Sequence, residues 1–151
     1  MQLTDEDLQY MLTELWSSML DLALDDEIDP TAAHDLSWCA AVDILSDDVV
    51  TGTVMVRCGD ELAERIAEAL FGLPSGSASF GEVRDAMGEV ANIVGGNVKG
   101  VLDAATVLGL PRTSRGEPAT SQAPVNRLLL ASEGYAVEAS YSASAMEGAG
   151  R

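Results

Sequence analysis

The sequence has few basic side chains: 8 Lys and Arg stand against 25 Asp and Glu, for a formal net charge of -17 at pH 7. A surface with this charge repels polyanions, so the composition argues against a nucleic-acid partner and against an anionic membrane surface. The sequence also lacks a basic N-terminal segment followed by an apolar run, and it lacks any apolar stretch of the roughly 20 residues that cross a bilayer. We therefore expect a soluble, cytoplasmic protein with no membrane partner.

Soft metal ligands are scarce as well, with two cysteines and one histidine in the chain. Cys39, Cys58 and His34 show no paired spacing, so the sequence predicts no metal site of its own. Both cysteines fall in strand-like segments, where a buried thiol is expected rather than a disulfide or a reactive group. With 151 residues, of which 47% are hydrophobic, the chain is predicted to form one domain over 1–145, followed by a disordered tail at 146–151.

The first half of the chain predicts a helix followed by a hairpin. Thr4 can cap a helix in which acidic residues crowd the first turn and apolar residues recur at helical spacing, and this helix should reach about Leu22. Two runs rich in β-branched and apolar residues, 36–45 and 49–58, follow an acidic loop. Because only a short polar turn separates them, they read as the two strands of a hairpin.

Two further helices are expected after the hairpin. The first lies in the run "DELAERIAEALFGLP" at 60–74, with Asp60 as its N-cap and with Gly72 and Pro74 as a stop signal. The second is expected to begin at about Phe80, where the neighbouring residues Ser79 and Glu82 form an S-x-x-E capping box.

The C-terminal third is expected to contain more strand. The second helix should continue to about Val107, and the proline of "GLP", Pro111, ends it or the segment just after it. Residues 112–126 are rich in Pro, Ser, Thr, Gly and Gln and read as a mobile loop with room for a short strand. The runs 127–132 and 135–144 then read as two final strands, with a turn at the glycine between them.

The second of these helices contains an unusual stretch, "DAMGEVANIVGGNVKG", which starts at Asp85 and carries four glycines. Each costs on the order of 1 kcal/mol relative to alanine inside a helix. At about 100° per residue, its polar positions fall within a sector of roughly 80°. This polar stripe consists of Asp85, Glu89, Asn92, Gly96, Lys99 and Asp103, and it is flanked by Gly88, Gly95 and Gly100. The opposite side, expected to pack on the hairpin, carries Val83, Met87, Val90, Val94, Val98 and Val101.

The small residues around the polar stripe suggest that something docks there, because they leave the backbone open to close approach. Asp85 and Glu89 are like charges at i,i+4 and repel each other by a few tenths of a kcal/mol, which a partner cation would relieve. Asn92 is a poor helix former whose amide both donates and accepts hydrogen bonds. An amphipathic helix with an incidental polar face explains the same residues, and the residues alone leave both interpretations open. The run "GGNVKG" lies within the helix and lacks the order of a phosphate-binding loop.

The series Asp85, Glu89 and Asn92 has the form D-x-x-x-E-x-x-N. Together with "GGNVKG" and the later "LGLP", it resembles the CheX/CheC/FliY family of response-regulator phosphatases. A single copy in so short a chain resembles CheX, because CheC usually carries two. The similarity is dense from about Glu82 to Pro111, whereas the long polar segment after Pro111 departs from the family pattern. The resemblance implies an α/β (α+β) fold with a mixed sheet of about five to six strands against long helices.

The resemblance also implies a reaction, the hydrolysis of the aspartyl phosphate on a phosphorylated CheY-like receiver domain in chemotaxis or a related two-component pathway. By family analogy, Asn92 orients the attacking water and Glu89 pairs with the phosphate-site lysine of the receiver. Asp85 and Lys99 match the motif and are given supporting roles. We expect Gly88, Gly95 and Gly96 to give clearance for the receiver's loops, which is our inference from their placement.

The receiver supplies the Mg²⁺ ion for this reaction, so the protein needs no cofactor of its own. CheX-type members often form homodimers by joining their sheets edge to edge, which makes a homodimer the expected assembly. Two other functions fit the same residues. A binding module of the flagellar-switch kind would keep the docking face without catalysis, and a structural dimer would have no receiver partner at all.

Overall fold

A hairpin forms the centre of the computed structural model, which describes residues 2–26, 28–29, 34–102, 105–116 and 123–143. Its register runs from Trp38 opposite Cys58 to Ser46 opposite Val49. The hairpin belongs to a six-stranded sheet with the order β3-β1-β2-β6-β5, in which β4 also pairs with β1. The strands are β1 (Trp38–Ser46), β2 (Val49–Cys58), β3 (Val107–Leu108), β4 (Arg112–Arg115), β5 (Asn126–Ser132) and β6 (Tyr135–Ala143).

The described strand pairings are all antiparallel, so the expected mixed sheet is corrected to an antiparallel one. The reason lies in the connections: two long hairpins, β1–β2 and β5–β6, lie side by side through the pairing of β2 with β6. The expected α+β class, the single domain and the two C-terminal strands are confirmed.

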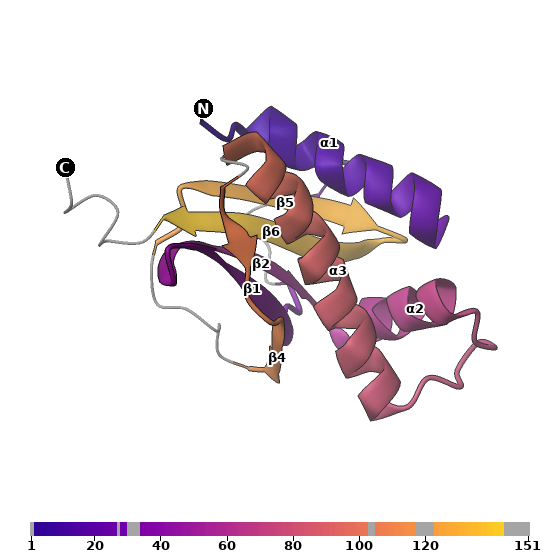
Figure 1. Cartoon of the computed structure of the whole chain (residues 1–151). Helices are drawn as coiled ribbons and strands as arrows, with labels where there is room; N and C mark the ends of the chain where they lie inside the picture. The colour runs from indigo at the N-terminus through magenta and orange to yellow at the C-terminus, as the bar shows by residue number, and fades with distance from the viewer. Residues whose placement is uncertain (1, 27, 30–33, 103–104, 117–122, 144–151) are drawn as a thin grey trace.

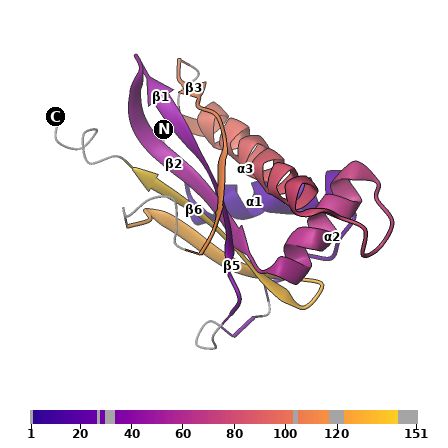
Figure 2. The same cartoon turned by 90° about the horizontal axis from the view of Figure 1, so that it is seen from below.

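The helices cover one face of this sheet, as Figures 1 and 2 show from two directions. In Figure 2 the sheet lies on one side of the molecule and all three α-helices lie on the other. One hydrophobic core between the two layers joins residues of α1, α2 and α3 to residues of the sheet. The helices are α1 (Asp5–Leu15), which continues into the π-helical turn η1 (Trp16–Leu20), α2 (Asp60–Phe71) and α3 (Phe80–Leu102).

Two of the predicted helix starts are confirmed by hydrogen bonds. Thr4 accepts a bond from the backbone N–H of Asp7, and the Asp7 carboxylate accepts one from the backbone N–H of Thr4, which makes a capping box. Ser79 and Glu82 exchange the same two bonds at the start of α3, with distances of 2.9 and 3.1 Å. Local sequence therefore defines where α1 and α3 begin.

The predicted helix ends are less accurate. The first helix ends at Leu20 instead of about Leu22, because Asp21 adopts a left-handed backbone conformation with φ 52°. The third helix ends at Leu102 instead of about Val107, and Val107 begins strand β3 beside β1. Val107 thus belongs to the sheet, although its local pattern continues the helix.

The predicted cap of α2 is wrong. Gly59 occupies the N-cap position without any side-chain hydrogen bond, and Asp60 is the first residue of the helix. The Asp60 carboxylate is instead engaged by Trp38 and Arg115, which come from β1 and β4. These tertiary partners explain why Asp60 does not cap the helix.

Other predictions fall partly outside the described residues. Of the expected loop at 112–126, the structure describes 112–116 and 123–126. These residues include strand β4 and the first residue of β5, whereas 117–122 lie outside the description. The expected disordered tail at 146–151 also lies outside it. Within the described part of the chain, no helix is both long and apolar enough to cross a membrane.

Candidate functional site on helix α3

The polar stripe lies on the surface of α3, directly opposite the side that packs on the sheet. Asp85, Glu89 and Gly96 are exposed, whereas Asn92 and Lys99 are half-buried. The predicted apolar side is confirmed, since all six of its residues are buried or packed against the core: Val83, Met87, Val90, Val94, Val98 and Val101. The helix therefore presents a narrow polar surface, and its opposite side is packed in the hydrophobic core.

Glu89 and Asn92 are one turn apart on this stripe, and no described residue forms a hydrogen bond or an ion pair with either side chain. Asn92 can donate and accept hydrogen bonds, while the ionised Glu89 only accepts them. The two side chains thus offer a carboxylate and a neutral amide to an incoming molecule without first breaking contacts within the protein.

The other charged residues of the stripe differ in their contacts. Asp85 forms an ion pair with Arg84 at 3.6 Å, but both side chains are more than half exposed, so the pair contributes about 0–1 kcal/mol. Lys99 has no ion pair with a described residue. Its suggested neighbour on the stripe, Asp103, lies outside the described residues.

Two of the three glycines assigned to receiver clearance face other parts of the protein. A Cβ atom at Gly95 would stand 2.5 Å from Val42 Cγ1 on β1, which is closer than real Cβ contacts. A Cβ atom at Gly88 would lie 3.4 Å from Thr113 Oγ1 and 3.6 Å from Pro111 Cβ. Both glycines are buried. The close contact at Gly95 lets α3 approach the sheet, whereas the distances at Gly88 are ordinary van der Waals contacts, and receiver clearance at these two positions stays a prediction.

Gly96 remains open to a partner. It is exposed, and the nearest atom to an added Cβ is Leu108 Cδ1 at 3.9 Å, an ordinary van der Waals distance. At Gly100 an added Cβ would meet nothing within 4 Å. Of the glycines in the motif, Gly96 is therefore the one that is both exposed and part of the polar stripe beside Asn92.

The chain after α3 returns alongside the stripe. Leu108 approaches Gly96, Pro111 approaches Gly88, and the Thr113 hydroxyl donates to the carbonyl oxygen of Arg84 at 3.3 Å. Residues 108–113 therefore run antiparallel to α3, and their middle lies level with the turn that carries Asn92. Figure 2 shows this segment passing along α3 after β3.

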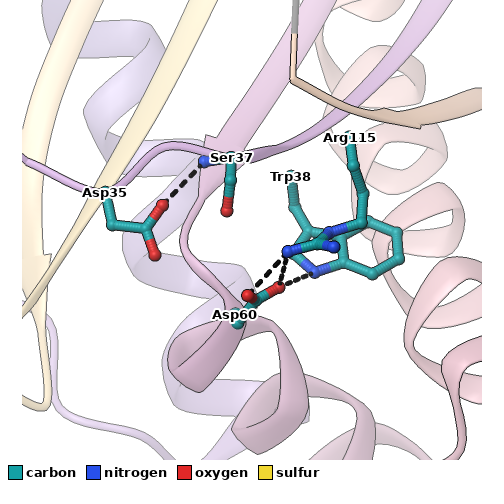
Figure 3. A network of polar contacts seen from close by, with 5 residues as sticks. All are labelled: Asp35, Ser37, Trp38, Asp60 and Arg115. Carbon is teal, nitrogen blue, oxygen red and sulfur yellow. Dashed lines mark hydrogen bonds and ion pairs between the residues drawn. The ribbon is translucent and has the colours of Figure 1, made fainter.

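A polar network holds the chain just after this segment (Figure 3). Arg115 donates to both oxygens of Asp60 at 2.6 Å, and its guanidinium carbon lies 5.4 Å from the centroid of the Trp38 ring. The Trp38 indole N–H donates to the same Asp60 carboxylate at 2.7 Å. Strand β4 is thereby joined to the first turn of α2 and to β1, so the position of β4 beside α3 is defined by side chains as well as by sheet pairing.

The groups whose acidity is shifted lie away from the stripe. Hydrogen bonding from Ser37 holds the pKa of Asp35 below its usual value. Burial raises the pKa of the Cys58 thiol well above its usual value, so this thiol stays protonated and is not a nucleophile. Cys58 and Cys39 are both buried, and they form no disulfide, as expected. Among the described residues, no group of three or more His, Cys, Asp or Glu is placed to hold a metal ion.

Comparison with known families identifies the chain. The family model described as "Chemotaxis phosphatase CheX" matches residues 39–133, a range that contains all but the first residue of the hairpin, α2, the whole of α3 and strand β5. The chain belongs to the CheX family. The match includes the polar stripe and the segment that runs beside it. No curated protein matches the sequence.

Solved CheX structures share the fold across almost the whole chain. CheX from Vibrio vulnificus superposes with a TM-score of 0.68 at 18% identity, covering 93% of this chain and 99% of that one. CheX from Desulfovibrio desulfuricans gives a TM-score of 0.70 at 15% identity, covering 92% and 97%. The structure of the CheX-CheY-BeF3-Mg+2 complex from Borrelia burgdorferi gives 0.66 at 18% identity, covering 91% and 95%. At these identities the superpositions show the fold.

Sequence reasoning found the stripe but missed its surroundings. Asp60 and Arg115 are 55 residues apart, and Asp43 and Arg112, which form an ion pair at 2.6 Å, are 69 apart. No local pattern marks such pairs. A weak signal was present in the two arginines of the segment 112–115, because a strongly acidic chain uses its few basic residues where carboxylates can pair with them.

Proposed function

We propose that this protein hydrolyses the aspartyl phosphate of a CheY-like receiver domain. The observation that carries the proposal is the pair Glu89 and Asn92 on α3 of a CheX-family chain, exposed or half-buried and unengaged by other described residues. A structural relative with the same fold, CheX of Borrelia burgdorferi, was solved in a complex with CheY, BeF3 and Mg+2. This supports a CheY-like receiver as the partner.

In the proposed reaction, a water molecule attacks the phosphorus atom in line with the bond to the aspartyl oxygen. That bond breaks, the receiver regains a free carboxylate, and inorganic phosphate is released. The receiver's own Mg²⁺ neutralises charge on the phosphoryl group, so the helper protein contributes mainly the position of the water. A neutral amide meets this requirement, because its oxygen accepts a hydrogen bond from the water while its NH₂ group donates to a phosphoryl oxygen.

Asn92 is the residue in our proposal that holds the water, and Glu89 is the residue that anchors the receiver. Glu89 is exposed and has no basic partner among the described residues, so its carboxylate is available for the phosphate-site lysine of the receiver. A lysine paired with Glu89 no longer contacts the phosphoryl group, which leaves room for the amide of Asn92. Gly96 allows the receiver backbone to approach this part of α3.

Asp85 and Lys99 have supporting parts at the two ends of the site. Asp85 is paired only weakly with Arg84, and Lys99 has no carboxylate partner among the described residues, so both can contact the receiver. The homodimer implied by the family resemblance and the cytoplasmic location expected from the sequence belong to the same proposal. Light scattering at several protein concentrations tests the dimer independently of the reaction.

The decisive experiment follows phosphate loss from purified CheY-like receivers of the source genome, phosphorylated in the presence of Mg²⁺. We expect the protein to accelerate decay of at least one receiver, and we expect Asn92→Ala and Glu89→Ala to abolish or strongly reduce the acceleration. The matched control is Asn97→Ala, which removes the same side chain from an exposed position of α3 beside a cavity next to α1.

Each result of this experiment has a clear meaning. Full activity of Asn97→Ala with loss of activity in Asn92→Ala supports the proposal. Binding of a receiver without any acceleration of decay would identify a non-catalytic binding module instead. If the protein neither binds nor dephosphorylates any of the receivers, the proposed function is contradicted altogether.

A further inference from the structure

The most exposed large hydrophobic side chain in the described residues is Leu110, at 87% exposure. Single exposed leucines are common on protein surfaces and need no explanation by themselves. Leu110 differs from such a residue in two ways. It lies beside the proposed catalytic residue, and its exposure is imposed by the contacts of the chain on both sides of it.

The contacts with α3 define where Leu110 lies. Leu108 approaches Gly96, and Pro111 approaches Gly88, so the chain between them passes the intervening two turns of the helix. Asn92 is midway between these two glycines in the sequence of α3. Leu110 therefore belongs to the part of the segment level with Asn92, next to the polar stripe.

The segment has little freedom to turn this leucine inward. The backbone N–H of Gly109 donates to the carbonyl oxygen of Asp43 at 2.8 Å, and Arg112 donates to the carboxylate of the same residue at 2.6 Å. Farther along, Arg115 is held by Asp60 (Figure 3). These contacts fix the chain on both sides of Leu110 to strand β1 and helix α2.

An apolar side chain surrounded by polar groups matches the apolar centre and polar rim of protein interfaces. The proposed receiver must place its phosphorylation site over Asn92, so its surface must also cover the neighbouring chain. Phe80, another exposed apolar side chain at 61% exposure, lies at the N-terminal end of α3.

We propose that Leu110 is an apolar anchor that is buried by the receiver domain when the receiver docks on Glu89 and Asn92. This inference rests on the proposed function and adds a residue outside the D-x-x-x-E-x-x-N motif. Leu110 strengthens docking and takes no part in positioning the water. Receivers that present an apolar side chain beside their phosphorylation site are therefore preferred over receivers with a charged side chain there.

The test measures docking separately from hydrolysis. Each receiver is loaded with Mg²⁺ and beryllofluoride, a stable substitute for the phosphoryl group, and its dissociation constant is measured by calorimetry with the full chain. We expect Leu110→Ser to weaken binding by about tenfold to a hundredfold, as expected for a leucine buried in a complex. In phosphate-decay assays the same variant raises the receiver concentration needed for half-maximal rate and leaves the rate at saturation unchanged.

Two further variants complete the test. Leu110→Met keeps an apolar side chain of similar volume and should bind nearly as well as the parent protein. Val125→Ser removes another exposed apolar side chain, 57% exposed, next to β5 at the opposite edge of the sheet, and should change nothing. Equal thermal stability of the variants shows that the fold is intact.

The outcomes separate this inference from the function on which it rests. If the parent protein binds and dephosphorylates a receiver and Leu110→Ser does so with unchanged affinity, the anchor is wrong and the proposed function stands. A lower saturated rate with unchanged affinity would equally overturn the anchor role. If the parent protein itself neither binds nor dephosphorylates any receiver, both proposals fail together.

Discussion

The backbone of Gly95 lies against the side chain of Val42, at a distance where an added Cβ atom would stand 2.5 Å from Val42 Cγ1. Val42 is fully buried on β1, and a β-branched side chain has few rotamers to which it can move. The glycine therefore allows α3 to lie close to the sheet. This contact explains why a helix with such an apolar side contains a residue that weakens helices.

The first prediction concerns stability at this contact. Gly95→Ala should lower the free energy of unfolding by up to roughly 2 kcal/mol, because overpacking a core costs about 1–3 kcal/mol and the better helix propensity of alanine returns about 1 kcal/mol. Gly96→Ala is the matched control on the next residue. Its added methyl group meets only Leu108 at 3.9 Å, so we expect stabilisation by about 0.5–1 kcal/mol. Urea unfolding of both variants measures the difference, and equal effects would contradict the packing role.

The second prediction concerns Asp60, which accepts hydrogen bonds from the Trp38 indole and from Arg115. Trp38 is 3% exposed, so Asp60→Ala leaves a nearly buried N–H without its partner at a cost of about 1–3 kcal/mol. Asp60→Asn keeps an acceptor for the indole and loses only the partly exposed ion pair with Arg115, whose contribution is about 0–1 kcal/mol. Urea unfolding should therefore show a clearly higher free energy of unfolding for Asp60→Asn than for Asp60→Ala. Because both variants remove the charge, equal destabilisation would show that charge, and not the indole hydrogen bond, dominates this network.

The third prediction concerns docking at Gly96. Gly96→Leu should leave the fold intact, since the position is exposed and open, yet its side chain would project from the polar stripe into the space assigned to the receiver. We expect at least a tenfold loss of affinity for the beryllofluoride-loaded receiver, which corresponds to about 1.4 kcal/mol. Circular dichroism checks the fold and calorimetry measures the binding. Unchanged affinity in Gly96→Leu would contradict close approach of the receiver at this turn.

The sequence predicted the parts of this structure that depend on neighbouring residues. The helix cap at Thr4, the capping box at Ser79 and the two-sided character of α3 follow from spacing along the chain, and the structure confirms them. The pattern of β-branched residues likewise indicated the hairpin 38–58. These features involve contacts between residues at most a few turns or one hairpin apart, so their pattern can be recognised without the fold.

What the sequence did not reveal depends on contacts between distant residues. Val107 pairs with Leu45 of β1, which ends the helical pattern early, and no local feature of 103–107 announces this pairing. The structural role of Gly95 likewise depends on its contact with Val42, which lies far away in the sequence. Asp60 appeared as a helix cap because its partners Trp38 and Arg115 belong to other strands. Glycines and carboxylates have several common uses, and tertiary contacts decide among them.

The central claim is that Asn92 positions the water that attacks the aspartyl phosphate of a docked receiver. The most direct measurement is the saturated rate of phosphate loss with Asn92→Ala, compared with the parent protein and Asn97→Ala, beside the affinity of each for the beryllofluoride-loaded receiver. We expect Asn92→Ala to lose about 10²–10³-fold in saturated rate, because a positioned polar group contributes about that much, while its affinity stays close to that of the parent. Asn97→Ala should match the parent in both quantities. A saturated rate for Asn92→Ala equal to that of the parent would contradict the account.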